Sequence, residues 1–194
     1  GSLWATHNAF LPAALPIYCA AQWYQFMPSG QILQFGRVED TNGIVSYAFP
    51  SIAVNSVDDV LLGFSRFSPT TYASAAYAFR SSTDPTNQMQ VDRVLKPGEG
   101  PYFKTFGGGR NRWGDYSATM VDPVNDLDMW TIQEYAAAPL GAISRWGTWW
   151  GMVSASGGVR FDVPTYSVNE APPPGFINIT VVNAEGTAGT VEWS

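Results

Sequence analysis

The sequence predicts an all-β chain, in which a partial β-propeller of two to three four-stranded antiparallel blades is followed by the first strands of a β-sandwich. Composition, short punctuated strands and an internal repeat support this prediction. Of the 194 residues, 45% are hydrophobic, 14% aromatic and only 13% charged, with 19 Gly and 14 Pro. Such a composition is typical of many short strands joined by tight turns and argues against long, solvated helices.

The internal repeat relates residues 54–62 to residues 121–129, so that Asn55 corresponds to Asp122 at an offset of 67 residues. In both copies an apolar stretch ends at Asn or Asp, passes through an acidic loop and resumes as a second apolar stretch. This pattern indicates a strand, a turn and a strand, at a period suited to propeller blades. A closed propeller needs at least about four blades, for which this chain is too short.

Period-two alternation and turn residues divide residues 1–153 into short strands, which we assign to the partial propeller. A hairpin is expected at Pro28, Ser29 and Gly30. The four central strands form one up-and-down blade, with about three strands of another blade on either side. The expected strands are 3–10, 20–27, 31–38, 49–55, 60–67, 72–80, 88–95, 116–121, 129–135 and 145–153.

The character of the sequence changes after residue 153, and residues 154–194 are expected to form a linker and a truncated sandwich. Strands are expected at 159–163, 166–170, 176–182 and 189–194. The segment is much shorter than the roughly 100 residues of a complete sandwich. We therefore expect only its opening strands to be present.

Charge and cysteine usage exclude several functions. The formal net charge is −6 and the sequence has no basic run, so nucleic acid has no electrostatic attraction to the chain. The single cysteine, Cys19, and the single histidine, His7, offer neither an internal disulfide nor a Cys/His metal site. The longest apolar run, residues 13–21, is interrupted by Pro16 and is too short to span a membrane.

Strings at residues 49–55, 112–117 and 146–149 resemble sialidase-like β-propeller segments of large bacterial exported proteins. This resemblance implies a secreted or cell-surface location and a family that mostly has no assigned activity. Residues 166–170 and 177–181 resemble the start of a Calx-β domain, a sandwich module of exported proteins. Some Calx-β domains bind calcium, and the resemblance places one of their ligands at Glu170.

The string Arg112-Trp113-Gly114-Asp115-Tyr116 is the first candidate ligand-binding site. Arg112 and Asp115 are suited to a polar group, while Trp113 or Tyr116 is suited to stacking on a sugar ring. The structural alternative is that Trp113 packs between blades and that Asp115 satisfies a turn or pairs with Arg112.

A glycoside hydrolase is the first alternative function. It requires two opposed carboxyl groups, or a Tyr nucleophile with a Glu partner in sialidases. Glu134 and Asp115 are the candidate carboxyls, and Tyr135 is the candidate nucleophile. Glu134 and Tyr135 are adjacent, so on a strand they point to opposite faces. A sialidase also needs several arginines, for which the chain offers Arg80, Arg110, Arg112 and Arg145.

A calcium-binding module is the second alternative. Asp122, Asp126 and Asp128 place oxygen ligands at alternating positions of one loop, which suits Ca²⁺. The loop lacks the Gly and the distal Glu of an EF-hand, and Asp is also a common turn residue.

These observations together predict a non-catalytic binding or adhesion scaffold that is a segment of a larger exported or surface protein. Its expected ligands are a glycan or another protein at Arg112, Trp113, Asp115, Tyr116 and Glu134. Exposed strand edges also predict self-association, or pairing with further blades of a longer protein. A purely structural protein with no ligand-binding role is the third alternative.

Overall fold

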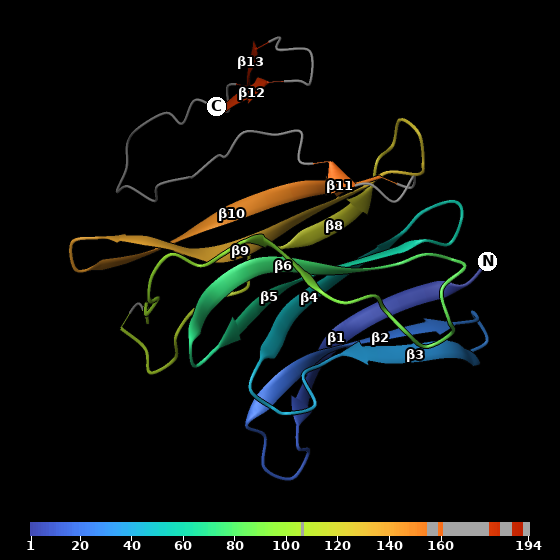
Figure 1. Cartoon of the computed structure of the whole chain (residues 1–194), viewed down its shortest axis with the longest axis horizontal. Helices are drawn as coiled ribbons and strands as arrows, with labels where there is room; N and C mark the ends of the chain where they lie inside the picture. Colours follow the sequence, from blue (N-terminus) through green and yellow to red (C-terminus); the bar gives the residue numbers. More distant parts are fainter. Residues whose placement is uncertain (106, 155–158, 161–178, 183–187, 192–194) are drawn as a thin grey trace.

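The computed structural model describes residues 1–105, 107–154, 159–160, 179–182 and 188–191, and this part of the chain is all β. Figure 1 shows three antiparallel sheets stacked one above another, from bottom to top in the order in which they occur in the sequence. The first sheet has three strands, while the middle and third sheets have four each. The all-β prediction is therefore confirmed.

Every sheet is an up-and-down meander, so the strand order in space follows the sequence. The first sheet contains β1 (Leu3–Leu11), β2 (Tyr18–Phe26) and β3 (Ile32–Val38). The middle sheet contains β4 (Ser46–Val54), β5 (Val60–Ser68), β6 (Thr71–Arg80) and β7 (Arg93–Lys96). The third sheet contains β8 (Ala118–Val121), β9 (Met129–Leu140), β10 (Ile143–Val153) and β11 (Val159–Arg160), and β12 (Ile179–Val182) pairs with β13 (Ala188–Val191) as a separate hairpin.

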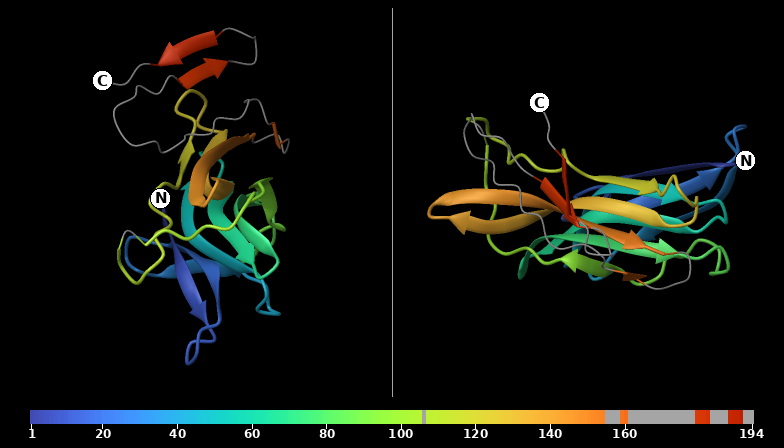
Figure 2. Two further views of the ribbon diagram at one scale, coloured as in Figure 1. Left: turned by 90° about the vertical axis from the view of Figure 1, so that its left-hand side faces the viewer. Right: turned by 90° about the horizontal axis from the view of Figure 1, so that it is seen from above.

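The middle sheet lies between the other two, as the left view in Figure 2 shows, and it is buried on both faces. Successive strand residues point to opposite faces, so Leu61 packs toward the third sheet and Leu62 toward the first, and both side chains are fully buried. Two hydrophobic cores result. The first–middle core contains Ala21, Trp23, Val38, Tyr47, Leu62, Phe64, Ala76 and Ala78, and the middle–third core contains Ala53, Leu61, Ala75, Tyr77, Leu95, Met129, Tyr135, Ala137 and Val153.

The repeated segments form equivalent strands that lie side by side. Ser51 Oγ on β4 contacts Thr119 Oγ1 on β8 at 2.7 Å, and Asn55 Nδ2 donates to the carbonyl of Leu127 at 2.8 Å. Both the amide and the hydroxyl of Ser56 donate to the carbonyl of Asp126. β4 and β8 therefore run parallel, and the turns that follow them are bonded directly to each other.

The offset of the repeat is not constant, which corrects the sequence analysis. Val54 pairs with Val60, and their equivalents Val121 and Met129 pair in the third sheet. The offset is thus 67 in the first strand of the unit and 69 in the second, because turn 122–128 is two residues longer than turn 55–59. Met129 corresponds to Val60, whereas the constant offset of 67 residues predicted that it corresponds to Leu62.

A ring of polar side chains lies between β4 and the third sheet. Gln133 Nε2 donates to Ser51 Oγ and to Thr131 Oγ1, each at 2.9 Å. Thr119 Oγ1 closes the ring, at 2.7 Å from Ser51 Oγ and 2.9 Å from Thr131 Oγ1. Because buried polar groups are costly unless they are paired, this ring favours a single alignment of the two sheets.

Three boundaries differ from the sequence prediction. β7 is confined to Arg93–Lys96, shorter than the expected strand 88–95. β9 continues to Leu140 and turns through Gly141, at φ +58°, directly into β10, where no hairpin was expected. β11 pairs with β10, so the third sheet extends beyond residue 153. The expected strand 166–170 lies outside the described residues, as do parts of the other tail strands.

No helix in the described part of the chain is long and apolar enough to cross a membrane.

Candidate functional site

A small crevice on the outer face of the third sheet gathers the five residues predicted as ligand-binding candidates. Its volume is about 60 Å³. The segment before β8 provides one wall, while Glu134 on β9 and a tryptophan on β10 provide the floor. The crevice is lined by Tyr102, Arg112, Trp113, Gly114, Asp115, Tyr116, Glu134 and Trp146.

Glu134 holds the wall of the crevice in place. Its side chain is buried, and its two carboxylate oxygens accept hydrogen bonds from the backbone amides of Gly114, at 2.8 Å, and Tyr116, at 3.0 Å. Burial raises the pKa of Glu134, and the nearby charge of Asp115 adds to this, while the hydrogen bonds from the two amides oppose it. Glu134 therefore positions the backbone of the loop and has little freedom to act on a ligand.

Arg112 and Asp115 form an open ion pair at the rim of the crevice. The guanidinium Nη2 lies 3.6 Å from the Asp115 carboxylate, and both side chains are more than 60% exposed. An exposed pair of this kind contributes little to stability. Both groups are accessible to a polar ligand.

The two aromatic residues of the string have different roles. Tyr116 stacks on Trp146, with ring centroids 4.7 Å apart and an interplanar angle of 11°, and Tyr116 is half exposed. Trp113 points inward, donates from Nε1 to Ser65 Oγ of the middle sheet at 3.0 Å, and contacts Tyr102 edge-on. Trp113 therefore packs between two sheets, and Asp115 pairs with Arg112.

A larger cleft shares Tyr102 and Trp113 with the crevice, and no pattern in the sequence predicts it. Its volume is about 280 Å³. It forms where the ends of several strands meet, so only the folded arrangement brings its lining together. The lining consists of Phe49, Phe67, Ser68, Thr71, Tyr72, Ala73, Gly100, Tyr102, Asn111, Trp113 and Ala136.

The other residues considered for hydrolysis do not join the crevice. Tyr135 belongs to the middle–third core, on the opposite face of β9 from Glu134 as expected. Arg80 is buried and donates to the carbonyls of Ser81 and Asp84. Neither Arg110 nor Arg145 lines the crevice. Trp146, which the sequence analysis did not include in the site, does line it. Its register opposite Ala136 could not be read from the sequence.

The acidic turn 122–128 uses its side chains to stabilise itself. Asp122 accepts hydrogen bonds from the amide of Val124 and from Trp130 Nε1, which lower its pKa. Asn125 Nδ2 donates to Asp128 Oδ2. In the described part of the chain, no group of three or more His, Cys, Asp or Glu residues is arranged to hold a metal ion. The geometry gives the calcium prediction for Asp122, Asp126 and Asp128 no support, and Glu170 lies outside the described residues.

No protein-family model matches the chain, and neither a curated protein nor a solved structure matches it.

Proposed function

We propose that this chain is a non-catalytic binding scaffold whose crevice at Tyr116, Trp146, Arg112 and Asp115 binds a glycan. The observation that carries the proposal is the engagement of Glu134. Both of its carboxylate oxygens accept hydrogen bonds from backbone amides of the loop. The one buried carboxylate of the crevice is therefore used to hold the loop in place. The other carboxylate, Asp115, is exposed and paired with Arg112, which does not match the two opposed carboxyls of a glycosidase.

The chemistry of the open surface favours a sugar as the ligand. The stacked pair of Tyr116 and Trp146 offers a flat apolar surface beside the charged groups of Arg112 and Asp115. A sugar ring has an apolar face and polar hydroxyl groups at its edge, so it is complementary to this arrangement. Only 13% of the residues are charged, which is consistent with a neutral ligand.

The proposed scaffold is a segment of a β-propeller that belongs to a larger exported or surface protein. In support, β4 and β8 are parallel, adjacent first strands of equivalent sheets. Cys19, at the start of β2, donates its amide to Ser46 Oγ at the start of β4. β2 therefore runs in the same direction as β4, and β1 runs in the opposite direction, as β5 does in the middle sheet.

The test is a glycan-binding screen with the intact protein, followed by titration of the best ligand against Tyr116→Ala and Arg37→Ala. Aromatic stacking is worth about 0.5–1.5 kcal/mol, so Tyr116→Ala is expected to weaken binding about two- to twelvefold. Arg37 lies on β3 in the first sheet, and its replacement should leave affinity unchanged.

Two results would overturn the proposal. Equal affinity of the wild type and Tyr116→Ala would place the ligand elsewhere. Release of sugar by the wild type that is lost in Glu134→Gln would show a catalytic role for that carboxylate.

A further inference from the structure

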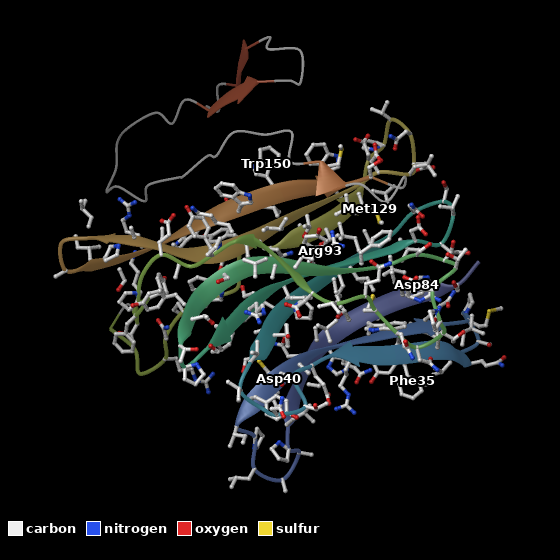
Figure 3. The ribbon with its side chains drawn as sticks, in the orientation of Figure 1. Phe35, Asp40, Asp84, Arg93, Met129 and Trp150 are labelled. Atoms are coloured by element: carbon white, nitrogen blue, oxygen red, sulfur yellow. The ribbon has the colours of Figure 1, made fainter. Side chains whose placement is uncertain are left out.

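The outer face of the third sheet carries a broad apolar surface beside the crevice. A cavity of about 430 Å³ lies over it, lined by Ala118, Met120, Pro123, Trp130, Thr131, Ile132 and Trp150. Met120 is 57% exposed and Trp150 is 37% exposed, although both are large hydrophobic side chains on strands. Figure 3 shows Trp150 on the side of β10 that faces away from the middle sheet. We call these residues the outer apolar face.

The internal repeat shows which buried surface this face corresponds to. Through the pairing of Val54 with Val60 and of Val121 with Met129, Met120 is equivalent to Ala53 and Trp130 to Leu61. Ala53 and Leu61 are buried in the middle–third core, where they pack against the next sheet of the stack. The outer apolar face is therefore the surface on which the repeat places another sheet.

The opposite end of the stack also presents an uncovered aromatic surface. His7, Tyr24 and Phe35 form a stacked ladder across β1, β2 and β3, with centroid separations of 5.7 Å and 6.3 Å. These residues point away from Trp23, which belongs to the first–middle core. Phe35 is 53% exposed and Leu33 is 44% exposed, and Figure 3 shows Phe35 at the end of the stack opposite to Trp150.

We propose that the outer apolar face binds a second copy of this chain through the His7–Tyr24–Phe35 ladder of that copy. In this contact, the first sheet of the second copy packs on the third sheet of the first copy. It occupies the position that the third sheet has relative to the middle sheet within one chain. It joins two different surfaces, so it is heterologous. If the rotation that relates successive copies returns to the first copy, the chains form a ring. If it does not, they form an open filament.

Light scattering of the full chain tests the association, with two variants that each disable one surface. Met120→Asp places a charge on the outer apolar face, and Phe35→Asp places one on the ladder. The wild type is expected to exceed the monomer mass of 21.1 kDa at concentrations up to about 100 µM, the range of weak complexes. Each variant alone is expected to remain monomeric, because every copy in that solution lacks the same half of the contact.

The decisive measurement mixes variants at equal concentration. Met120→Asp keeps its ladder and Phe35→Asp keeps its outer apolar face, so the mixture retains one intact contact and should form a 1:1 dimer. A double variant, Met120→Asp with Phe35→Asp, loses both surfaces and should remain monomeric alone. Val91→Asp, at a side chain that is 85% exposed outside both surfaces, is the control and should associate like the wild type.

Circular dichroism of every variant verifies that the sheets are retained. A monomeric wild type across the concentration range would overturn the proposal. Association that survives in the double variant would overturn it as well, and so would a failure of the two complementary variants to pair.

Discussion

At the scale of single residues, Glu134 is central to the candidate site because it joins β9 to the loop that precedes β8. Its carboxylate binds the amides of Gly114 and Tyr116, and these residues flank Asp115. The position of the Arg112–Asp115 pair and the stack of Tyr116 on Trp146 both depend on this anchor. A buried acid thus shapes the surface that faces solvent.

Because burial raises the pKa of Glu134 above its ordinary value of 4.5, the folded state holds the proton more tightly than the unfolded state. The sign follows from linkage: the contribution of Glu134 to stability is greatest below the unfolded pKa and declines as pH rises through the folded pKa. We expect the stability of the wild type relative to Glu134→Gln to fall as the pH rises above about 4, the range in which an ordinary Glu side chain titrates.

Urea denaturation followed by tryptophan fluorescence at several pH values measures this difference. Asp115→Asn, which changes an exposed carboxylate of the loop that Glu134 holds, serves as the control and should show a weaker trend. A wild type that gains stability over Glu134→Gln with rising pH would contradict the assigned sign.

At the scale of elements, the contact between β5 and β9 depends on a glycine. Gly63 faces the polar ring, and a Cβ atom at this position would press on Gln133 Nε2 and Thr131 Oγ1. Both atoms are committed to hydrogen bonds, so neither can move aside without loss. The equivalent position in the third sheet is Ile132, on the outer face, where there is room for a large side chain.

Gly63→Ala is therefore expected to reduce the free energy of unfolding by about 1–3 kcal/mol, the usual cost of overpacking a core. Gly109→Ala is the matched control, because nothing lies within 4 Å of a Cβ placed there, and its effect should stay within about 0.5 kcal/mol. Thermal and urea unfolding give both values. Equal stability of the two variants would mean that the sheets separate easily at the ring.

Strands with regular alternation and clear turn residues could be predicted from the sequence, and the others could not. β5 and β6 match their expected ranges closely because hydrophobic residues, several of them aromatic, run through both, and Asp or Ser-Pro-Thr turns bound them. β9 was cut short at Tyr135 because Ala136 to Pro139 has low strand propensity. Pairing with β10 overrides that propensity.

At the scale of the whole molecule, the middle sheet couples the other two. Leu61 and Leu62 are neighbours on β5, yet each belongs to a different core. In repeat proteins, stability is approximately a sum of contributions from neighbouring units. If the same holds here, a cavity in one of the two cores should destabilise the outer sheet that packs on that core more than the other outer sheet.

Leu61→Ala and Leu62→Ala are each expected to cost about 2–5 kcal/mol, as for other buried leucines. In hydrogen–deuterium exchange, Leu61→Ala should raise exchange mainly in β8, β9 and β10, and Leu62→Ala mainly in β1, β2 and β3. Leu140→Ala, at a side chain that is 64% exposed, should change neither. Identical exchange profiles for both core variants would indicate one cooperative unit without separable interfaces.

The candidate site shows how far sequence reasoning reaches at this scale. Arg112, Trp113, Asp115 and Tyr116 could be grouped because they are consecutive, and Glu134 was named for its chemistry. Trp146 and the adjoining cleft depend on strand register and on how sheets stack, and neither is encoded in a local pattern. The orientation of Trp113 was one of two alternatives until the contact with Ser65 decided it.

The seven-residue turn between β8 and β9 has a practical consequence for protein engineering. It is two residues longer than its counterpart between β4 and β5. Even so, the two turns are hydrogen-bonded to each other, and β8 and β9 remain paired up to Val121 and Met129. The added length is taken up by exposed residues such as Val124, which is 91% exposed. Foreign peptides inserted at this tip should be displayed to solvent while the underlying framework folds as before.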